Sequence, residues 1–222
     1  MSPNPDFDRL AWRNRAMAFV TRSHRHLWGK NNEDPQAFLF LQGLKNQFAK
    51  EFLLGWNKFG QERPLQNWGF HNDAQTGKTL FLPSGIVIPY IIEKKLTSVF
   101  ILPYDEGKAQ PVFMVPGSAG PTLVLGGNSG NRKVAVLGDL FKGLFLFQEC
   151  RETFCVIIHT NPDQALEPSA ASIIGTADVC FIFSLDKKEE RLNRQIFSNM
   201  PESCFITGRS KEDIKKICLT DR

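Results

Sequence analysis

The sequence predicts an α+β region followed by an α/β region with a Rossmann-like parallel sheet. Three observations lead to this prediction. An apolar stripe recurs at helical spacing near the N-terminus, short β-prone runs split by Pro and Gly fill residues 81–125, and strand-like and helix-like segments alternate from residue 133 onward. Strands separated by helices are typical of parallel sheets with right-handed crossovers. We therefore expect two regions, residues 1–125 and 131–222, joined by a glycine-rich link.

The first region begins with helices. Residues 8–28 predict a helix whose apolar stripe consists of Leu10, Ala16, Phe19, Val20 and Leu27. Asp34-Pro35 is typical of a helix start, with an acidic N-cap residue followed by proline at the first helical position. We expect this second helix to end near Gly43 and a further short helix to lie within residues 44–54.

Antiparallel strands are expected next. Residues 56–80, rich in Trp, Gly and Asn, predict irregular structure. The β-prone runs that follow are Ile86–Ile88, Leu96–Leu102, Val112–Val115 and Thr122–Leu125. Their short length and the Pro and Gly residues between them favour a small antiparallel region.

The second region is expected to alternate strands with helices. The predicted strands are 134–137, 154–158, 179–183 and 203–206. The predicted helices are 140–149, one within 164–175, 187–197 and 211–219.

Composition excludes several classes of protein. The chain has 222 residues, 42% hydrophobic and 23% charged, which is an ordinary globular composition. No apolar run approaches the ~18 residues of a membrane span, and the N-terminus lacks the basic and apolar parts of a signal peptide. We therefore expect a cytoplasmic protein that does not bind membranes. The five cysteines show no metal-ligand spacing and predict reduced, mostly buried thiols rather than a zinc site.

Positive charge is concentrated near the N-terminus. The net charge is only +4, but residues 9–30 hold six Lys or Arg residues and no Asp or Glu. Such a segment can meet phosphates, and it can equally be the solvated face of a helix.

Three motifs that suggest enzyme sites fail on inspection. Thr76-Gly77-Lys78-Thr79 resembles the end of a P-loop, but the required upstream glycine is absent and an extended segment follows. The glycines of residues 126–130 do not form a dinucleotide-binding motif, since a strand rather than a helix follows them. His159 ends a predicted strand, where ligands often meet parallel sheets, but a lone histidine there is more often structural.

A series of motifs across nearly the whole chain resembles one known family. In order, they are Leu54-Gly55-Trp56-Asn57, Trp68-Gly69-Phe70, LPSGIVIP at residues 82–89, and Val115-Pro116-Gly117-Ser118. They resemble bacterial and phage DNA-primase-like proteins, and LPSGIVIP followed by VPGS is the most specific part. The helical segments 12–28 and 34–56 also resemble the family's N-terminal region. In that family these segments form the primase core, which precedes a Toprim domain and commonly follows a zinc ribbon that this sequence lacks.

The second region is similar to Toprim in the order of its elements. The resemblance implies a glutamate at the end of the first strand, as general acid/base, and a later D-x-D that holds Mg²⁺. By element order the glutamate position falls on Leu137 and an acidic helix position on Phe141. The D-x-D falls on residues 186–188, where Asp186 is kept and Lys188 replaces the second acid. One carboxylate with a neighbouring cation is a poor Mg²⁺ site, although Asp139 lies nearby in sequence.

Three acids could rescue the metal site if the fold brought them to it. They are Asp139, Glu149 and Asp178, and a shift of register by two residues is a further possibility. The family's later Lys-Asp pair corresponds to Lys211 with Asp213, offset by one residue.

The resemblance and the charge pattern together suggest a primase-like nucleic-acid-binding protein of DNA replication, from a bacterium or a mobile element, with a catalytically degenerate Toprim site. Its partners would be single-stranded DNA or RNA and replication proteins such as a helicase. The candidate groove residues are Arg13, Arg22, Arg25, Trp56 and Lys78; the vestigial catalytic residues are Asp186 and Asp139.

Two other functions remain open at this point. The first is an active primase or Toprim nucleotidyltransferase that uses Mg²⁺ with a zinc-ribbon partner. The second is a protein-interaction module that mimics or inhibits a primase. Trp56 and Trp68 can also be ordinary packing residues between the helices and the sheet.

Overall fold

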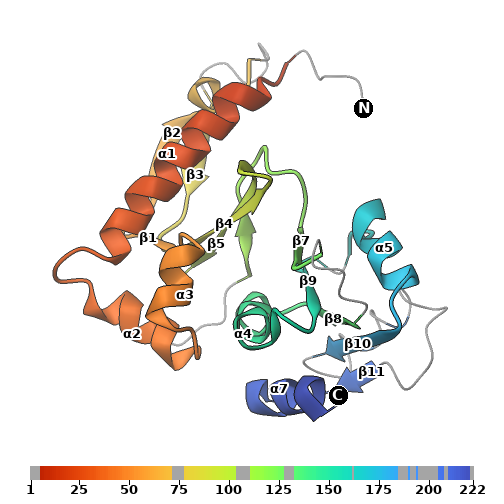
Figure 1. Cartoon of the computed structure of the whole chain (residues 1–222). Helices are drawn as coiled ribbons and strands as arrows, with labels where there is room; N and C mark the ends of the chain where they lie inside the picture. Colours follow the sequence, from red (N-terminus) through yellow and green to blue (C-terminus); the bar gives the residue numbers. More distant parts are fainter. Residues whose placement is uncertain are drawn as a thin grey trace. The chain divides into compact units, whose positions relative to one another are not determined.

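The computed structural model describes residues 6–71, 78–103, 111–127, 133–161, 163–184, 190, 194, 205–207 and 210–220, with the backbone alone for residues 211 and 217–220. The chain divides into two compact units (Figure 1). The first comprises residues 1–41 and 45–119, and the second comprises residues 42–44 and 120–222. Within the described residues, no helix is both long and apolar enough to cross a membrane.

Helix α1 (Arg9–Leu27) opens the first unit and confirms the helix predicted over residues 8–28. The Asp8 side chain caps it by accepting hydrogen bonds from the backbone N–H groups of Leu10 and Ala11. Its buried residues are Trp12, Ala16, Phe19, Val20, Ser23 and Leu27. Leu10, which the sequence placed in the apolar stripe, is 66% exposed, and Trp12 fills the buried position instead.

Two short helices follow. Helix α2 (Glu33–Leu41) begins one residue before the predicted Asp34 cap, with Pro35 in its first turn, where a missing N–H costs nothing. Helix α3 (Asn46–Glu51) lies within the segment for which a further short helix was predicted.

The first unit also contains an antiparallel sheet with strand order β1-β4-β5-β6. These strands are β1 (Gly55–Asn57), β4 (Gly85–Ile92), β5 (Lys95–Pro103) and β6 (Phe113–Met114). The antiparallel arrangement predicted for this part of the chain is confirmed.

The irregular structure predicted for residues 56–80 is wrong in part. An antiparallel ribbon of β2 (Gln61–Pro64) and β3 (Thr79–Leu82) lies there, together with the short 3-10 helix η1 (Leu65–Trp68). β3 also confirms that an extended segment, not a helix, follows the P-loop-like motif. The ribbon joins the core formed under α1, which includes Trp12, Phe19, Trp68, Leu80, Leu82, Val87 and Ile101.

The second unit is built on a five-stranded sheet with strand order β11-β10-β8-β9-β7. The elements run β7 (Thr122–Leu125), β8 (Lys133–Leu137), α4 (Leu140–Cys150), β9 (Cys155–His159), α5 (Pro168–Gly175), β10 (Val179–Ser184), β11 (Phe205–Thr207) and α7 (Lys211–Thr220). The pairs among β8, β9, β10 and β11 are all parallel. The α+β then α/β fold class is thereby confirmed.

Strand β7 differs from the sequence-based grouping. The sequence grouped residues 122–125 with the first region, whereas β7 pairs antiparallel with β9 in the second unit. Most of the helix predicted over 187–197 lies outside the described residues.

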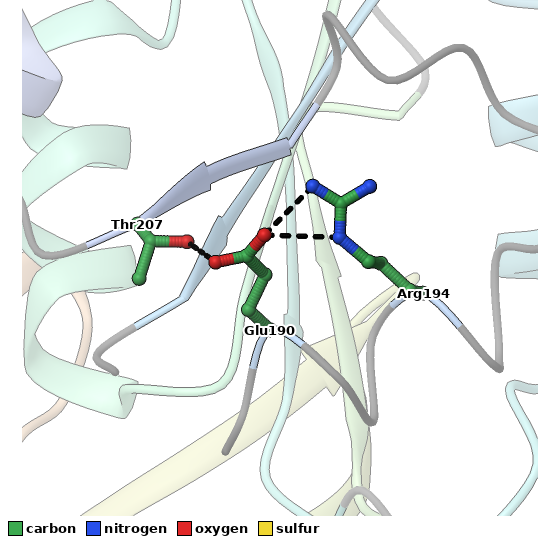
Figure 2. A network of polar contacts seen from close by, with 3 residues as sticks. All are labelled: Glu190, Arg194 and Thr207. Carbon is green, nitrogen blue, oxygen red and sulfur yellow. Dashed lines mark hydrogen bonds and ion pairs between the residues drawn. The ribbon is translucent and has the colours of Figure 1, made fainter. Parts of the chain in front are cut away.

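A polar network borders the sheet at β11 (Figure 2). Oε1 of Glu190 accepts from Nε and Nη2 of Arg194 at 2.9 and 2.7 Å, and Oε2 accepts from the Thr207 hydroxyl. The Arg194 guanidinium also lies 4.5 Å from the centre of the Phe205 ring. Because the Glu190 carboxylate has these partners, the network links Glu190 and Arg194 to the edge strand β11.

An ion pair joins the two helices α4 and α7. Nζ of Lys215 lies 2.5 Å from Oε2 of Glu149, whose side chain is only 12% exposed. The hydrogen bond that Lys215 donates to Glu149 is the main cause that raises the pKa of Lys215 above its usual value. The pair therefore contributes stability below the unfolded lysine pKa of ~10.4, and this contribution is lost as pH rises through the higher folded pKa.

Lys215→Met is expected to destabilise the second unit by about 1–3 kcal/mol at pH 7, because it leaves the Glu149 carboxylate partly buried without its cation. Urea unfolding of the single variants, Lys215→Met and Glu149→Gln, and of the double variant measures the coupling between the two residues. Strictly additive losses would contradict the prediction.

Candidate functional site

The exposed face of α1 is basic. Arg15, Arg22 and Arg25 are exposed on it, as the sequence predicted for Arg22 and Arg25. Arg13 lies on the opposite side of the helix from Arg22, because nine residues at 3.6 per turn make two and a half turns. Arg13 is half-buried, and its buried Nε has no hydrogen-bond partner among the described residues. Arg13 is therefore not part of the face that carries Arg22 and Arg25.

Arg22 meets a second arginine that sequence reasoning missed. Nη2 of Arg22 donates to Oε1 of Gln61 at 3.2 Å, and Nη2 of Arg63 donates to the same oxygen. Burial and then the charge of Arg63 lower the pKa of Arg22. Within the described part of the chain, the ion pairs found include neither arginine. This pair, Arg22 and Arg63, is a concentration of positive charge that no carboxylate of the described residues offsets.

Trp56 lies on the side of β1 that faces away from α1. Its neighbours Gly55 and Asn57 are buried, and strand residues alternate between faces. Trp56 is half-buried, and Lys58 Nζ lies 5.9 Å from its ring centre and 5.4 Å from that of Phe59. Phe59 is 70% exposed. The Lys58 amine can contact a phosphate, and the rings of Trp56 and Phe59 can stack on bases. Sequence reasoning missed Lys58 and Phe59 because they lie in a segment with no sequence motif.

Lys78 is exposed just before β3, and its carbonyl accepts from the backbone N–H of Leu65. Because Thr79 pairs with Pro64, Lys78 lies beyond the end of β2 that is remote from Gln61. Trp68, by contrast, is buried in the core under α1 and serves packing.

In the second unit, the carboxyl ends of β8 and β10 border a small pocket. Leu137, Gly138, Asp139, Lys142, Phe183, Ser184 and Ile214 line it. The chain leaves β8 toward β9 on one side and leaves β10 toward β11 on the other, so the point between β8 and β10 is the topological switch point where open parallel sheets bind ligands. Its empty volume of about 190 Å³ is below the ~300–1,000 Å³ of typical small-molecule sites.

The polar groups of this pocket are already used in the fold or carry the wrong charge for a cation. Asp139 is the N-cap of α4, and its Oδ1 accepts from the backbone N–H of Lys142 at 2.9 Å. The Lys142 side chain brings a positive charge to the same pocket. Leu137 and Phe141, at the two positions where the resemblance implies acids, are buried hydrocarbons. Asp186 lies outside the described residues.

Of the three rescue acids, Asp139 lines the pocket, whereas Glu149 and Asp178 do not reach it. Glu149 is in the last turn of α4, paired with Lys215. Asp178 directly precedes β10, which places it at the amino end of a strand whose carboxyl end borders the pocket. Asp213 caps α7 instead, accepting at Oδ2 from the Ser210 hydroxyl at 2.7 Å. The pocket has therefore gained no acid from elsewhere among the described residues.

These residues do not fit a resident Mg²⁺ ion. Mg²⁺ requires carboxylate or other oxygen ligands in near-octahedral geometry, and a leucine and a lysine supply neither. Across the described residues, no group of three or more His, Cys, Asp and Glu side chains could hold a metal.

His159 has a structural role. Its Nε2 donates to the carbonyl oxygen of Gln164 at 2.9 Å, so Nδ1 is left to accept from the Thr122 hydroxyl, also at 2.9 Å. Both ring nitrogens are thereby used to join β9, β7 and the loop after β9.

Comparisons with known proteins place this fold. No family model matches the sequence, and no curated protein matches it. Among solved structures, a DnaG catalytic core matches with a TM-score of 0.66 at 10% identity, covering 93% of this chain and 76% of the other. A DNA primase domain from Pseudomonas aeruginosa matches with a TM-score of 0.66 at 13% identity, covering 95% and 78%. A DnaG primase catalytic domain bound to ssDNA matches with a TM-score of 0.61 at 11% identity, covering 96% and 78%.

The chain thus has the fold of a DNA primase catalytic core. The resemblance to DNA-primase-like proteins, inferred from the order of four short motifs, is confirmed at the level of the fold.

Proposed function

We propose that this chain is a primase-like nucleic-acid-binding protein that acts in DNA replication, with a Toprim-like centre that no longer catalyses nucleotidyl transfer. The observation that carries the proposal is the contrast between the fold of the chain and the residue at the end of strand β8. The fold is that of a primase core, yet the strand end where the resemblance implies a catalytic glutamate holds the buried Leu137. Leucine cannot transfer a proton or bind a metal.

The basic face of α1 supports the binding part of the proposal. Arg15, Arg22 and Arg25 project from one helix, and Arg63 adds a further charge beside Arg22. Arginines without an acidic partner among the described residues are suited to phosphates, since binding releases the counterions of the strand. One similar structure is described as bound to ssDNA, and we propose the same class of ligand, DNA or RNA, for this chain.

The wider setting follows from the same proposal. A protein of this kind would work in the cytoplasm of a bacterium or with a mobile element, beside replication proteins such as a helicase.

One observation favours an active enzyme as the second candidate. Asp139 lines the pocket at the carboxyl ends of the strands, and one of its oxygens is used in the cap. If Asp186 completed a site with it, Mg²⁺-dependent primer synthesis would survive, alone or with a zinc-ribbon partner.

A titration of a labelled single strand distinguishes these functions. We expect fluorescence anisotropy to report binding that weakens about 20- to 50-fold between 50 and 200 mM salt, as for three or four phosphate contacts, and that is unchanged by Mg²⁺. Primer synthesis on the same template should be absent with and without Mg²⁺.

Binding or primer synthesis that requires Mg²⁺ would overturn the degenerate centre and favour the enzyme. Absence of binding at low salt would overturn the nucleic-acid function and favour a protein-interaction module.

A further inference from the structure

Arg22 and Arg63 come together from elements far apart in the sequence. Arg22 belongs to α1, and Arg63 belongs to β2, where it pairs with Leu80 of β3. One terminal nitrogen of each guanidinium donates to Oε1 of Gln61. Because both nitrogens lie within hydrogen-bond distance of one atom, they are at most about 6 Å apart. Two like charges at this separation repel each other, so their proximity calls for a compensating group.

A chain of hydrogen bonds fixes the Gln61 amide between them. Nδ2 of the buried Asn57 donates to the carbonyl oxygens of Leu82 and Pro83, at 3.3 and 2.6 Å. Carbonyl oxygens only accept, so the Asn57 oxygen points the other way and accepts from Nε2 of Gln61. The Gln61 oxygen is thereby turned toward the arginines. It holds them in position but, being neutral, does not cancel their charge.

The nearest acid in sequence does not supply the missing charge. Glu62 lies between Gln61 and Arg63 on β2, and alternation turns it to the opposite face of the ribbon, where it pairs with the exposed Phe81. Arg22 is exposed and Arg63 is half-buried, so both reach the solvent at one place.

We propose that Arg22 and Arg63 form a phosphate-binding pair that grips one phosphodiester of a nucleic-acid strand, with Gln61 as the spacer between them. This inference rests on the proposed function and assigns it a specific contact. Each guanidinium carries five N–H donors in a planar fork that matches phosphate oxygens. The Gln61 oxygen accepts from one N–H group of each arginine, and the other N–H groups can donate to a phosphate. A phosphodiester at this point places one negative charge within reach of both guanidinium groups and so reduces their mutual repulsion.

The surroundings favour a strand over free phosphate. Arg15 and Arg25 continue the basic face on either side of Arg22. From Arg15 to Arg25 the helix rises about 15 Å, which is longer than one phosphate group. A polymer of phosphates can engage the whole face, whereas a single ion cannot.

The test uses the full chain and a fluorescein-labelled single strand of about 20 nucleotides, titrated at several salt concentrations. Arg22→Gln and Arg63→Gln should each weaken binding, and the double variant, which loses the contact to one phosphodiester, should reduce the magnitude of the salt slope by about 0.7. Arg63→Lys keeps the charge but loses the fork, so we expect weaker binding with the wild-type slope.

Lys95→Gln is the matched control. It removes one exposed charge from the same unit, at the end of β4 and β5 remote from Asn57, because Asn57 pairs with Gly85 and Lys95 pairs with Ile92. We expect its binding to equal that of the wild type. Circular dichroism of each variant reports whether the fold is retained.

The outcomes separate this inference from the function on which it rests. If the wild type binds and a folded double variant binds with the same affinity and slope, the pair is overturned and the proposed function stands. If the wild type does not bind the strand, the proposed function itself fails. A third arm adds inorganic phosphate alone. If phosphate raises the Tm of the wild type but not of the double variant, while both bind the strand alike, the pair serves a free phosphate and the strand contact is overturned.

Discussion

Trp12→Ala is expected to destabilise the first unit by about 3–5 kcal/mol, the range for removing a large aromatic side chain from a core. Trp12 is fully buried, and its Nε1 donates to the carbonyl oxygen of Pro116 at 2.8 Å. Its indole also packs so closely on Gly117 that a Cβ at that glycine would lie 2.4 Å from the ring. The alanine leaves a cavity and also loses the hydrogen bond to the Pro116 carbonyl, and the cavity is the larger of the two costs because Pro116 is exposed to solvent.

Trp12→Phe separates these two contributions. It keeps most of the packing and loses the hydrogen bond, so we expect a smaller loss of about 1–2 kcal/mol. Urea unfolding followed by tryptophan fluorescence is the appropriate measurement, since all four tryptophans lie in the first unit and report on it alone. A loss below about 1 kcal/mol for Trp12→Ala would contradict the burial described here.

Gly55→Ala is expected to cost about 3 kcal/mol, at the upper end for over-packing. A Cβ at Gly55 would lie 2.6 Å from the backbone nitrogen of His24 and 2.6 Å from the carbonyl carbon of Ser23. Backbone atoms cannot move aside as a flexible side chain does, so α1 and β1 must separate. Because α1 carries Arg22, we also expect weaker strand binding in this variant.

Gly175→Ala is the control for the glycine substitution. A Cβ at Gly175 meets nothing within 4 Å, and alanine is favoured over glycine in a helix by about 1 kcal/mol. We expect this variant to be as stable as the wild type or slightly more so when urea unfolding is followed by circular dichroism, which reports on both units, because Gly175 lies in the unit without tryptophan. Equal losses for the two glycine variants would contradict the close approach of α1 to β1.

The sequence predicted the elements with strong local patterns. α1, α4 and the parallel strands β8, β9 and β10 match their expected positions because apolar periodicity and turn residues are local properties. Strand β2 was missed because its four residues, Gln61–Pro64, are mostly polar and carry no strand signal. Its pairing depends on β3, which follows η1 and a segment outside the described residues.

The candidate site was predicted only in part for the same reason. Arg22 and Arg25 could be inferred from a basic segment on a helix, whereas Arg63 and Gln61 belong to the missed strand. Arg13 was grouped with them by sequence proximity, although helical geometry turns it away. Counting helical angles from the sequence would have separated Arg13, but no local signal indicates that Arg63 meets Arg22.

Strand β7 has a consequence for how the second unit could be isolated. Every residue of β9 is buried, and β7 covers the outer edge of β9 with its own backbone. A fragment begun at residue 131, after the glycine-rich segment, would lack β7 and leave β9 as an open apolar edge. Such edges add strands from other copies and lead to aggregation. A fragment begun at Gly120 retains β7, so the difference between a soluble fragment and an insoluble one rests on eleven residues that precede the parallel sheet.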